Sequence, residues 1–326
     1  MVVLSLAALL ATGPMDPQAV PPPQVAPPQT ARAEAEPVEL RDVVVSGRPL
    51  DTLIRDFVNE VAEPNRHRGL ARWDNNVCVG AANLRAEAAQ YLVDRISTVA
   101  GDLGLSPGQP GCTPNVLIVA TSDGSELAAG LVEERRRAFR MGGSGMDRGG
   151  VALKDFQETD RPVRWWQMAL PVDSETGLRV TRIPGECRDP CDTPETYAPH
   201  ISVFAASRLR TQIVDNIIRT IVIVDVDQVS DLSIQQLADY IAMVTLAQIN
   251  PDADTRAYAS ILNVFEEPET SPHLTDWDLA YLGGLYAAER NDANRRANSS
   301  EVQDSIRREH QRMRGEGDGD GDAPAE

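Results

Sequence analysis

Three side chains in the sequence could take part in chemistry: Asp239, Tyr240 and Asp278. A carboxylate can act as a general base and a phenol can donate a proton, so a pocket holding all three would supply the parts of a hydrolase site. The pair Ser122-Asp123 adds a hydroxyl and an acid without a visible base, and the chain has no Gly-x-Ser-x-Gly motif. These residues are candidates only, and the sequence leaves the catalytic residues unknown.

Residues 231–249 should form the helix that positions the first two of these side chains. Ser233 and Gln236 have the spacing of a capping box, which marks the beginning of a helix. Apolar residues cover most of the circumference behind them, so we expect this helix in the middle of the domain. Asn250-Pro251 should end it, because the residue before proline disfavours helical backbone angles. The preceding run 221–224 is β-branched throughout and predicts a strand buried on both faces.

Strand and helix patterns alternate through the rest of the chain. We expect helices over 50–61, 83–103, 123–137, 274–288 and 300–314, strands over 73–79, 116–120, 201–209 and 221–226, and a hairpin of 163–171 with 178–183. This succession predicts an α/β (α+β) fold, a single domain in which a mixed sheet packs against helices. Asp225 and Asp227 follow the buried strand, where they either form a functional site or cap the next loop. Thr275 and Asp278 have capping-box spacing at the helix over 274–288.

The two ends of the chain differ in composition from the middle. Residues 1–13 have the apolar character of a signal-peptide leader, although no Lys or Arg precedes Arg32. This run is too short to span a bilayer, so we expect no transmembrane segment. Residues 14–40 are rich in proline and predict an extended linker. We expect the folded domain over 41–314, between disordered termini, the second being the acidic tail 315–326.

The formal net charge of −18 limits the partners of the protein. Nucleic acids and anionic membranes both require a positive surface, so neither is expected as a partner. The glycine-rich segment 141–150 lacks the Gly-Lys-Ser/Thr of a P-loop and the spacing of a dinucleotide fingerprint, and it predicts a surface loop. We therefore expect no cofactor, and a partner that is either another envelope protein or a small ligand.

Four cysteines, an even number in a chain with an export-like beginning, predict two disulfide bonds and an oxidising compartment. Cys187 and Cys191 form a C-x3-C pattern in a loop, which leaves Cys78 to pair with Cys112. The alternative is a zinc site of four thiolates, which would require all four cysteines to converge from distant parts of the chain. The disulfide interpretation places the protein in the periplasm or the cell envelope.

The histidines give no metal-binding pattern. His67, His200, His273 and His310 lie far apart, each beside residues typical of loops, so we expect them at the surface and predict no metal site.

The order of strands and helices, with a helix after the last strand, resembles the zincin-like fold of the metzincin metallopeptidases. In that family this helix carries His-Glu-x-x-His-x-x-Gly-x-x-His, whose histidines hold zinc and whose glutamate activates a water molecule. On this chain the motif would place Ala238, Ala242 and Gln248 at the histidines, Asp239 at the glutamate and Thr245 at the glycine. The resemblance therefore implies a degenerate scaffold without the three metal ligands.

The chain is also similar to a group of uncharacterised exported proteobacterial proteins over residues 71–290. The segments that carry this similarity are 260–265, 274–278 and 285–286. A zincin-like scaffold without its metal, together with the proline-rich linker and the predicted disulfides, favours an exported, non-catalytic binding or structural module of the cell envelope. The alternative that we keep is a periplasmic hydrolase, a peptidase or an esterase, with a rearranged site around Asp239 and Asp278. A third reading is a ligand-binding protein that uses the space vacated by zinc.

Overall fold

The centre of the structure is a four-stranded mixed sheet with the order β2-β4-β8-β5. The computed structural model describes residues 48–64, 69–139, 148–187, 197–201, 207–292 and 294–319, which all belong to the unit Arg48–Glu326. β2 (Val79–Ala82), β4 (Val116–Thr121) and β8 (Ile213–Asp225) run parallel, and β5 (Val163–Asp173) is antiparallel to β8. The expected α/β class with a mixed sheet and helices is confirmed. The predicted leader and linker lie outside the described residues.

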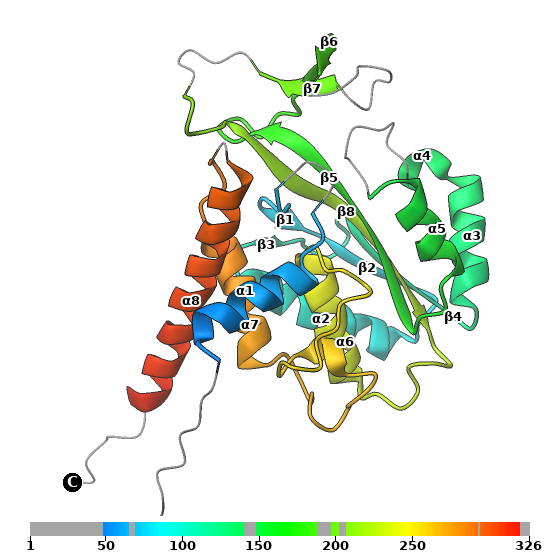
Figure 1. Ribbon diagram of the computed structural model, residues 1–326. Helices are drawn as coiled ribbons and strands as arrows, with labels where there is room; N and C mark the ends of the chain where they lie inside the picture. The colour runs from blue at the N-terminus through cyan, green and yellow to red at the C-terminus, as the bar shows by residue number, and fades with distance from the viewer. Residues whose placement is uncertain are drawn as a thin grey trace, which may run out of the picture. The chain divides into compact units, whose positions relative to one another are not determined.

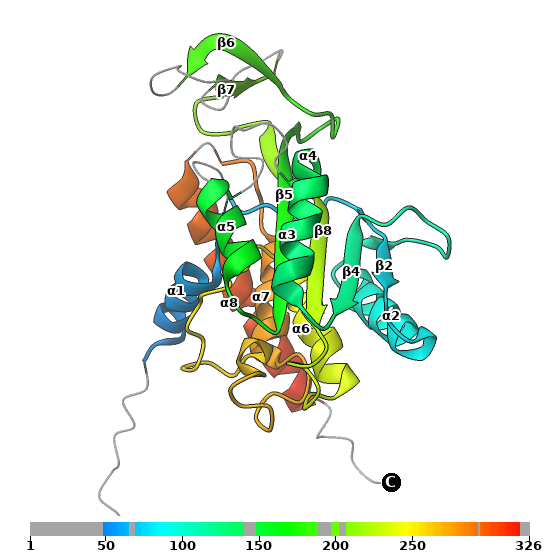
Figure 2. The ribbon, with the colours of Figure 1, turned by 90° about the vertical axis from the view of Figure 1, so that its right-hand side faces the viewer.

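Helices cover both faces of this sheet (Figures 1 and 2). α2 (Ala86–Asp102) and α6 (Ile234–Leu246) pack on one face, and α3 (Gly124–Glu134), α4 (Arg136–Phe139) and α5 (Gly150–Glu158) lie on the other. Alternate residues of β8 serve the two faces, since Val222 and Val224 belong to the α6 side and Ile221 and Ile223 to the α3 side. This two-sided burial explains the continuous apolar run of the strand.

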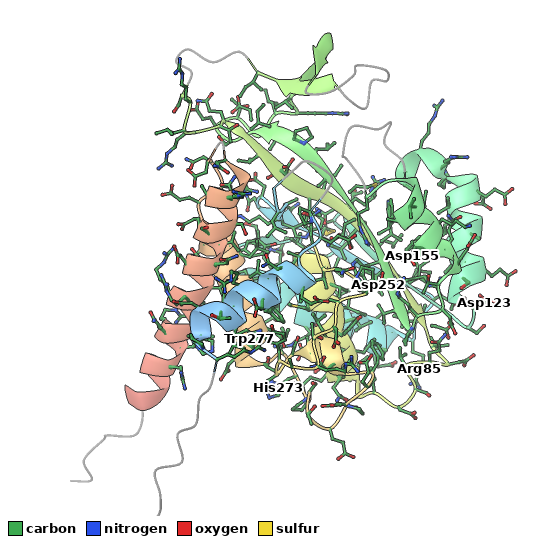
Figure 3. All side chains as sticks on the ribbon, viewed as in Figure 1. Arg85, Asp123, Asp155, Asp252, His273 and Trp277 are labelled. Atoms are coloured by element: carbon green, nitrogen blue, oxygen red, sulfur yellow. A yellow bond between two sulfur atoms is a disulfide. The ribbon has the colours of Figure 1, made fainter. Side chains whose placement is uncertain are left out.

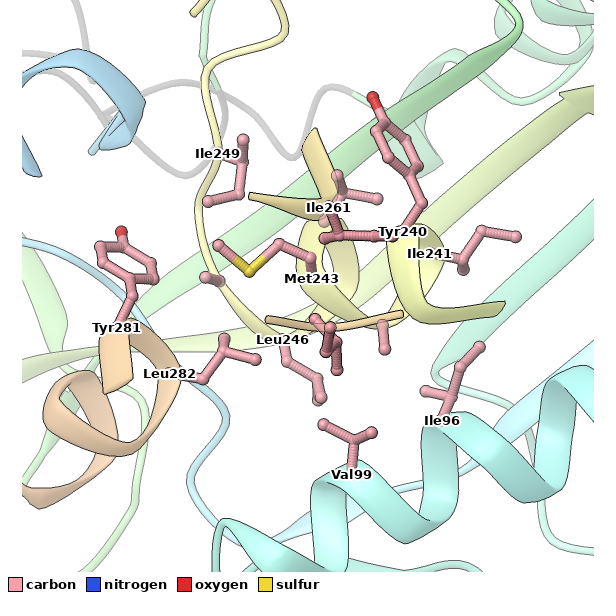
Figure 4. Packing of buried hydrophobic residues seen from close by; sticks show 14 of the residues in the cluster. Ile96, Val99, Tyr240, Ile241, Met243, Leu246, Ile249, Ile261, Tyr281 and Leu282 are labelled. Atoms are coloured by element: carbon pink, nitrogen blue, oxygen red, sulfur yellow. The ribbon is translucent and has the colours of Figure 1, made fainter. Parts of the chain in front are cut away.

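Helix α6 is buried on all sides, as its composition predicted. Ser233 and Gln236 form the predicted capping box, and every residue from Gln236 to Leu246 is buried. Its apolar neighbours come from α2, α7 and the segment after α6, including Ile96, Val99, Ile261 and Leu282 (Figure 4). The helix ends at Leu246 rather than at 249, because Ala247 is already extended and Ile249 pairs with Ala62 in an isolated bridge.

The C-terminal carbonyls of α6 are buried and receive side-chain donors from three distant segments. Gln167 on β5 donates through Nε2 to the carbonyls of Val244 (3.0 Å) and Ala247 (2.9 Å). The indole of Trp73 donates to Thr245 O at 2.8 Å, and the hydroxyl of Tyr286 donates to Leu246 O at 2.8 Å. These bonds replace the partners that the last turn of any helix lacks.

Three further helices pack beside the α6 layer: α1 (Leu50–Val61), α7 (Asp276–Ala287) and α8 (Arg295–Gly319). The contact between α7 and α8 depends on Gly284, because a Cβ atom there would lie 2.4 Å from the Cα atom of Ile306. α7 begins with the predicted capping box of Thr275 and Asp278. α8 continues past residue 314 to Gly319, into the segment that we expected to be disordered.

The predicted hairpin of 163–171 with 178–183 is present only next to its turn. There the N–H of Asp173 donates to the carbonyl of Leu178, the N–H of Val180 donates to the carbonyl of Pro171, and a bridge joins Val172 to Arg179. The main partner of β5 was not predicted, because β5 pairs along its whole length with β8. β6 (Thr181–Cys187) instead pairs with β7 (Tyr197–His200). β5 pairs mainly with β8 rather than with the nearer segment 178–183, because β8 is apolar on both faces and needs a neighbouring strand on each edge to lie inside the sheet.

Two smaller differences concern the boundaries of elements. The strand expected over 73–79 is divided into β1 (Asn76–Val77), which pairs with β3 (Ser106–Pro107), and β2, which begins at Val79. α5 was not predicted, because its short sequence follows the glycine-rich segment. A short 3-10 helix, Ile261–Asn263, interrupts the connection between α6 and α7.

The predicted disulfide between Cys78 and Cys112 is confirmed, with 6.2 Å between the two Cα atoms. It fastens the junction of β1 and β2 to the loop before β4. Gly108 lies against this bond, since a Cβ atom there would lie 2.4 Å from the Cys112 sulfur. Cys191 lies outside the described residues, so its pairing with Cys187 stays a prediction. No helix in the described ranges is long and apolar enough to cross a membrane.

Candidate functional site

Asp239, the acid at the centre of α6, is completely buried and bonded at both carboxylate oxygens. The Nε atom of Arg95 on α2 donates to Oδ1 at 2.5 Å, and the backbone N–H of Leu274 donates to Oδ2 at 3.0 Å. The carboxylate therefore ties α2 and the segment before α7 to the central helix. It has no exposed surface from which to activate a water molecule.

Asp278 is also completely buried and accepts four hydrogen bonds. Its donors are the hydroxyl of Ser260 (2.6 Å), the N–H of Ile261 (2.7 Å), and the N–H (3.0 Å) and hydroxyl (2.8 Å) of Thr275. Burial raises the pKa of the Asp278 carboxyl, and these hydrogen bonds act in the opposite direction. The capping role predicted for Asp278 is confirmed and extends to a second segment.

The structure places the two acids along one stretch of backbone, because they bind the N–H groups of the adjacent residues Leu274 and Thr275. Tyr240 lies elsewhere on α6, where its ring packs edge-on against Trp165 and Phe265. Burial raises the pKa of the Tyr240 phenol above its ordinary value. The three predicted site residues are thus all buried, and each has a partner that accounts for it structurally.

The positions at which the resemblance would place metal ligands do not fit a zinc ion. Ala238 and Ala242 are fully buried and carry no donor atom, and the side-chain oxygen of Gln248 accepts the N–H of Ala71 at 2.7 Å. Within the described residues, no group of three or more His, Cys, Asp or Glu side chains could hold a metal ion.

The aspartates at the ends of the strands act as caps. Asp225 accepts from the N–H groups of Gly124 (3.3 Å) and Asp227 (3.2 Å). Asp123 accepts from the N–H of Glu126 at 2.8 Å and begins α3. These bonds favour the capping alternative over a functional site at this edge of the sheet.

The described histidines do not form a cluster. The ring of His273 contacts the carbonyl of Leu274, and the ring of His310 packs edge-on against Trp277. His273 and Trp277 lie well apart from Asp123 in Figure 3. His200 lies in β7, and His67 is outside the described residues.

A cavity of about 430 Å³ lies where α1, α7, α8 and the beginning of β8 meet. This volume is within the range of small-molecule pockets, roughly 300–1,000 Å³. Among the described residues, its apolar lining is aliphatic: Val58, Ala62, Pro64, Leu70, Ile213, Val214, Leu285 and Val302. Sequence reasoning missed this pocket, because its walls come from four separate parts of the chain and contain no motif.

Some polar side chains of the pocket are bonded within the protein, and others are not. Glu289 forms an ion pair with Arg210 at 2.7 Å, and Asp215 is not free either. Arg290 donates to Asn216 Oδ1 at 2.9 Å and forms an ion pair with Asp74 at 3.6 Å, and burial lowers the pKa of its guanidinium. Arg296 is exposed and makes no ion pair or side-chain hydrogen bond within the described part of the chain. Among the described lining residues, Arg296 is therefore the charged side chain left for a ligand.

Comparison with known proteins adds no relative: no family model, no curated protein and no solved structure matches this chain.

Proposed function

We propose that the protein is an exported, non-catalytic binding module of the cell envelope, built on a zincin-like scaffold without its metal ligands. The observation that carries this proposal is the state of Asp239 and Asp278. Both carboxylates are fully buried, and each is bonded to donors that hold the fold together. A general base must reach the proton that it abstracts, and neither acid does so in this arrangement.

Two features support the zincin-like part of the proposal. The parallel strands β2, β4 and β8 are followed by a single buried helix, α6, which is the place of the zinc-binding helix in the metzincins. At the ligand positions of that helix, Ala238 and Ala242 pack in the core. A scaffold that kept the helix and lost the metal would have this appearance.

Export is supported by the Cys78–Cys112 bond together with the signal-peptide-like residues 1–13. Disulfide bonds persist in oxidising compartments and are rare in the cytosol.

A binding role fits the structure better than the hydrolase alternative, because the pocket and the acids are separate. The lining of the pocket in the described residues includes the hydroxyl of Ser299 but no histidine or free carboxylate to activate it. The space vacated by zinc is also unsuited to a ligand, since Ala238 and Ala242 are fully buried and do not line the pocket.

The first experiment is the metal content of the purified mature protein by emission spectrometry, joined to a panel of peptide and ester substrates. We expect no stoichiometric zinc and no turnover. Near-stoichiometric zinc would overturn the degenerate scaffold. Turnover that disappears in Asp278→Asn, a variant that keeps the shape of the side chain and can still accept from Ile261 and Thr275, would restore the hydrolase.

A further inference from the structure

We infer that the pocket between α1, α7, α8 and β8 binds a small amphipathic anion, namely an aliphatic chain that ends in a carboxylate or a phosphate. This inference rests on the binding role proposed above and names the class of ligand. It depends on three properties of the pocket: its lining, its charge and the position of that charge.

The lining selects an aliphatic body. None of the described residues that line the pocket is aromatic, and side chains such as Val58, Leu70, Leu285 and Val302 offer aliphatic surface. Leu285 and Val302 are 2% and 6% exposed, so they form part of the deep wall. Burial of each methylene group against such a wall contributes about 0.8 kcal/mol of transfer free energy. An aromatic ligand would find no ring to stack on.

The charge selects an anionic end group. Both pocket carboxylates are engaged, Glu289 with Arg210 and Asp215 with its own partner, whereas Arg296 is unpaired within the described residues. Arg290 is a second guanidinium in the lining, but it is already bonded to Asn216 and forms an ion pair with Asp74 at 3.6 Å, so Arg296 is the cation left for the anion. Guanidinium groups bind carboxylates and phosphates through two parallel hydrogen bonds.

The two kinds of surface are separated in the way that an amphiphile requires. Arg296, Glu289 and Asn59 are exposed and mark the mouth of the pocket, while Val58, Leu285 and Val302 are buried. The chain of the ligand would enter between α1 and α8 and leave its charged end at Arg296.

Isothermal titration of the full mature protein with four probes of equal chain length tests the proposal. The probes are octanoate, octyl phosphate, 1-octanol and octylamine. We expect the two anions to bind, the alcohol to bind at least about tenfold more weakly, and the amine not to bind. Comparison of octanoate with octyl phosphate decides between the two anionic end groups.

Two variants locate the binding site. Arg296→Gln should weaken octanoate binding by about three- to tenfold, while Arg135→Gln, at the exposed C-cap of α3, should leave it unchanged. Gly69→Leu should abolish binding, because Gly69 lines the pocket and a Cβ atom there meets nothing within 4 Å. Gly130→Leu on α3, where a Cβ atom also meets nothing within 4 Å, is its control. Circular dichroism confirms that each variant folds.

The proposal is overturned if octanol binds as tightly as octanoate, if Arg296→Gln leaves the Kd unchanged, or if binding survives Gly69→Leu. It is also overturned if none of the probes binds. These binding results are independent of the metal and turnover measurements, which test separately whether the protein is non-catalytic.

Discussion

The surroundings of α6 and the pocket beside α8 use polar side chains in opposite ways. Around α6, Asp239, Asp278 and Gln236 are buried, and every one of them is bonded to backbone or side-chain donors and acceptors from another segment. In the pocket, Arg296 and Asn59 are exposed and make no side-chain bond within the described residues. Buried polar groups must be satisfied inside the fold, whereas exposed ones remain available to a ligand.

This contrast explains why buried acids such as Asp239 and Asp278 can be mistaken for catalytic residues when only the sequence is read. Carboxylates are as useful for holding a long connection as they are for catalysis. The connection between α6 and α7 has little regular structure, and a connection of that length is uncommon in a compact domain. Asp278, Asp239 and Gln236 supply the hydrogen bonds that regular structure would otherwise provide.

Asp278→Ala should produce the largest loss of stability. It leaves the buried N–H groups of Ile261 and Thr275 without acceptors, and we expect the free energy of unfolding to fall by roughly 3–4 kcal/mol in urea titrations. Asp278→Asn keeps an acceptor for both groups and should cost about 1 kcal/mol. Asp276→Ala, an exposed neighbour, is the control. Equal losses in the Ala and Asn variants would show that the negative charge, rather than the acceptors, is what the region requires.

The disulfide bond between Cys78 and Cys112 lies outside both regions and gives a reference for these losses of unfolding free energy. Cys78→Ala with Cys112→Ala should lower the free energy of unfolding by about 2–4 kcal/mol, because the bond closes a loop with a sequence separation of 34 residues. Thiol counting on the native exported protein should find neither Cys78 nor Cys112 reactive. Detection of both thiols in the folded protein would refute the pairing.

One asparagine in each region allows a direct comparison of their contributions to stability. Asn263 is buried and bonds to Thr255 and Tyr258, so Asn263→Ala should cost about 2 kcal/mol of unfolding free energy. Asn59 is exposed at the mouth of the pocket, and Asn59→Ala should change stability by less than about 0.5 kcal/mol. Thermal denaturation of the two variants side by side provides the measurement. A similar loss of unfolding free energy in both variants would show that the two regions do not differ in how their polar side chains contribute to stability.

Tyr286→Phe should have the smallest effect on the packed region, about 1 kcal/mol in urea titrations. The change removes the hydroxyl that donates to Leu246 O and that accepts the N–H of Trp73 at 3.3 Å, while the ring remains. Tyr91→Phe, at a half-exposed position on α2, is the matched control and should have no effect. An unchanged Tyr286→Phe protein would mean that water replaces the hydroxyl at the end of α6.

The sequence predicted those features that depend on neighbouring residues. Capping boxes at Ser233 and Thr275 were correct, because a cap involves residues three positions apart. The burial of α6 was correct because its composition leaves no polar face. The main partner of β5 was missed because β8 lies far along the chain, whereas the turn-like sequence after β5 predicted only the short antiparallel contact beside it.

The candidate site shows the same limit. The residue types at positions 239, 240 and 278 were noticed, but only the fold reveals that Arg95, Ser260 and Ile261 already occupy the carboxylates. Spacing can suggest that a side chain is able to do chemistry. It cannot show whether the side chain is accessible, since accessibility depends on segments that approach from elsewhere in the sequence.

The way in which α6 ends has a consequence for the order of folding. Its last carbonyls need the side chains of Trp73, Gln167 and Tyr286, and the first and last of these are 213 residues apart in the sequence. The last carbonyls of the helix therefore obtain these partners only when segments from most of the domain have assembled, and contacts of such separation form slowly. In hydrogen exchange the amides of α6 should open only with the whole domain, which makes this helix a reporter of global unfolding.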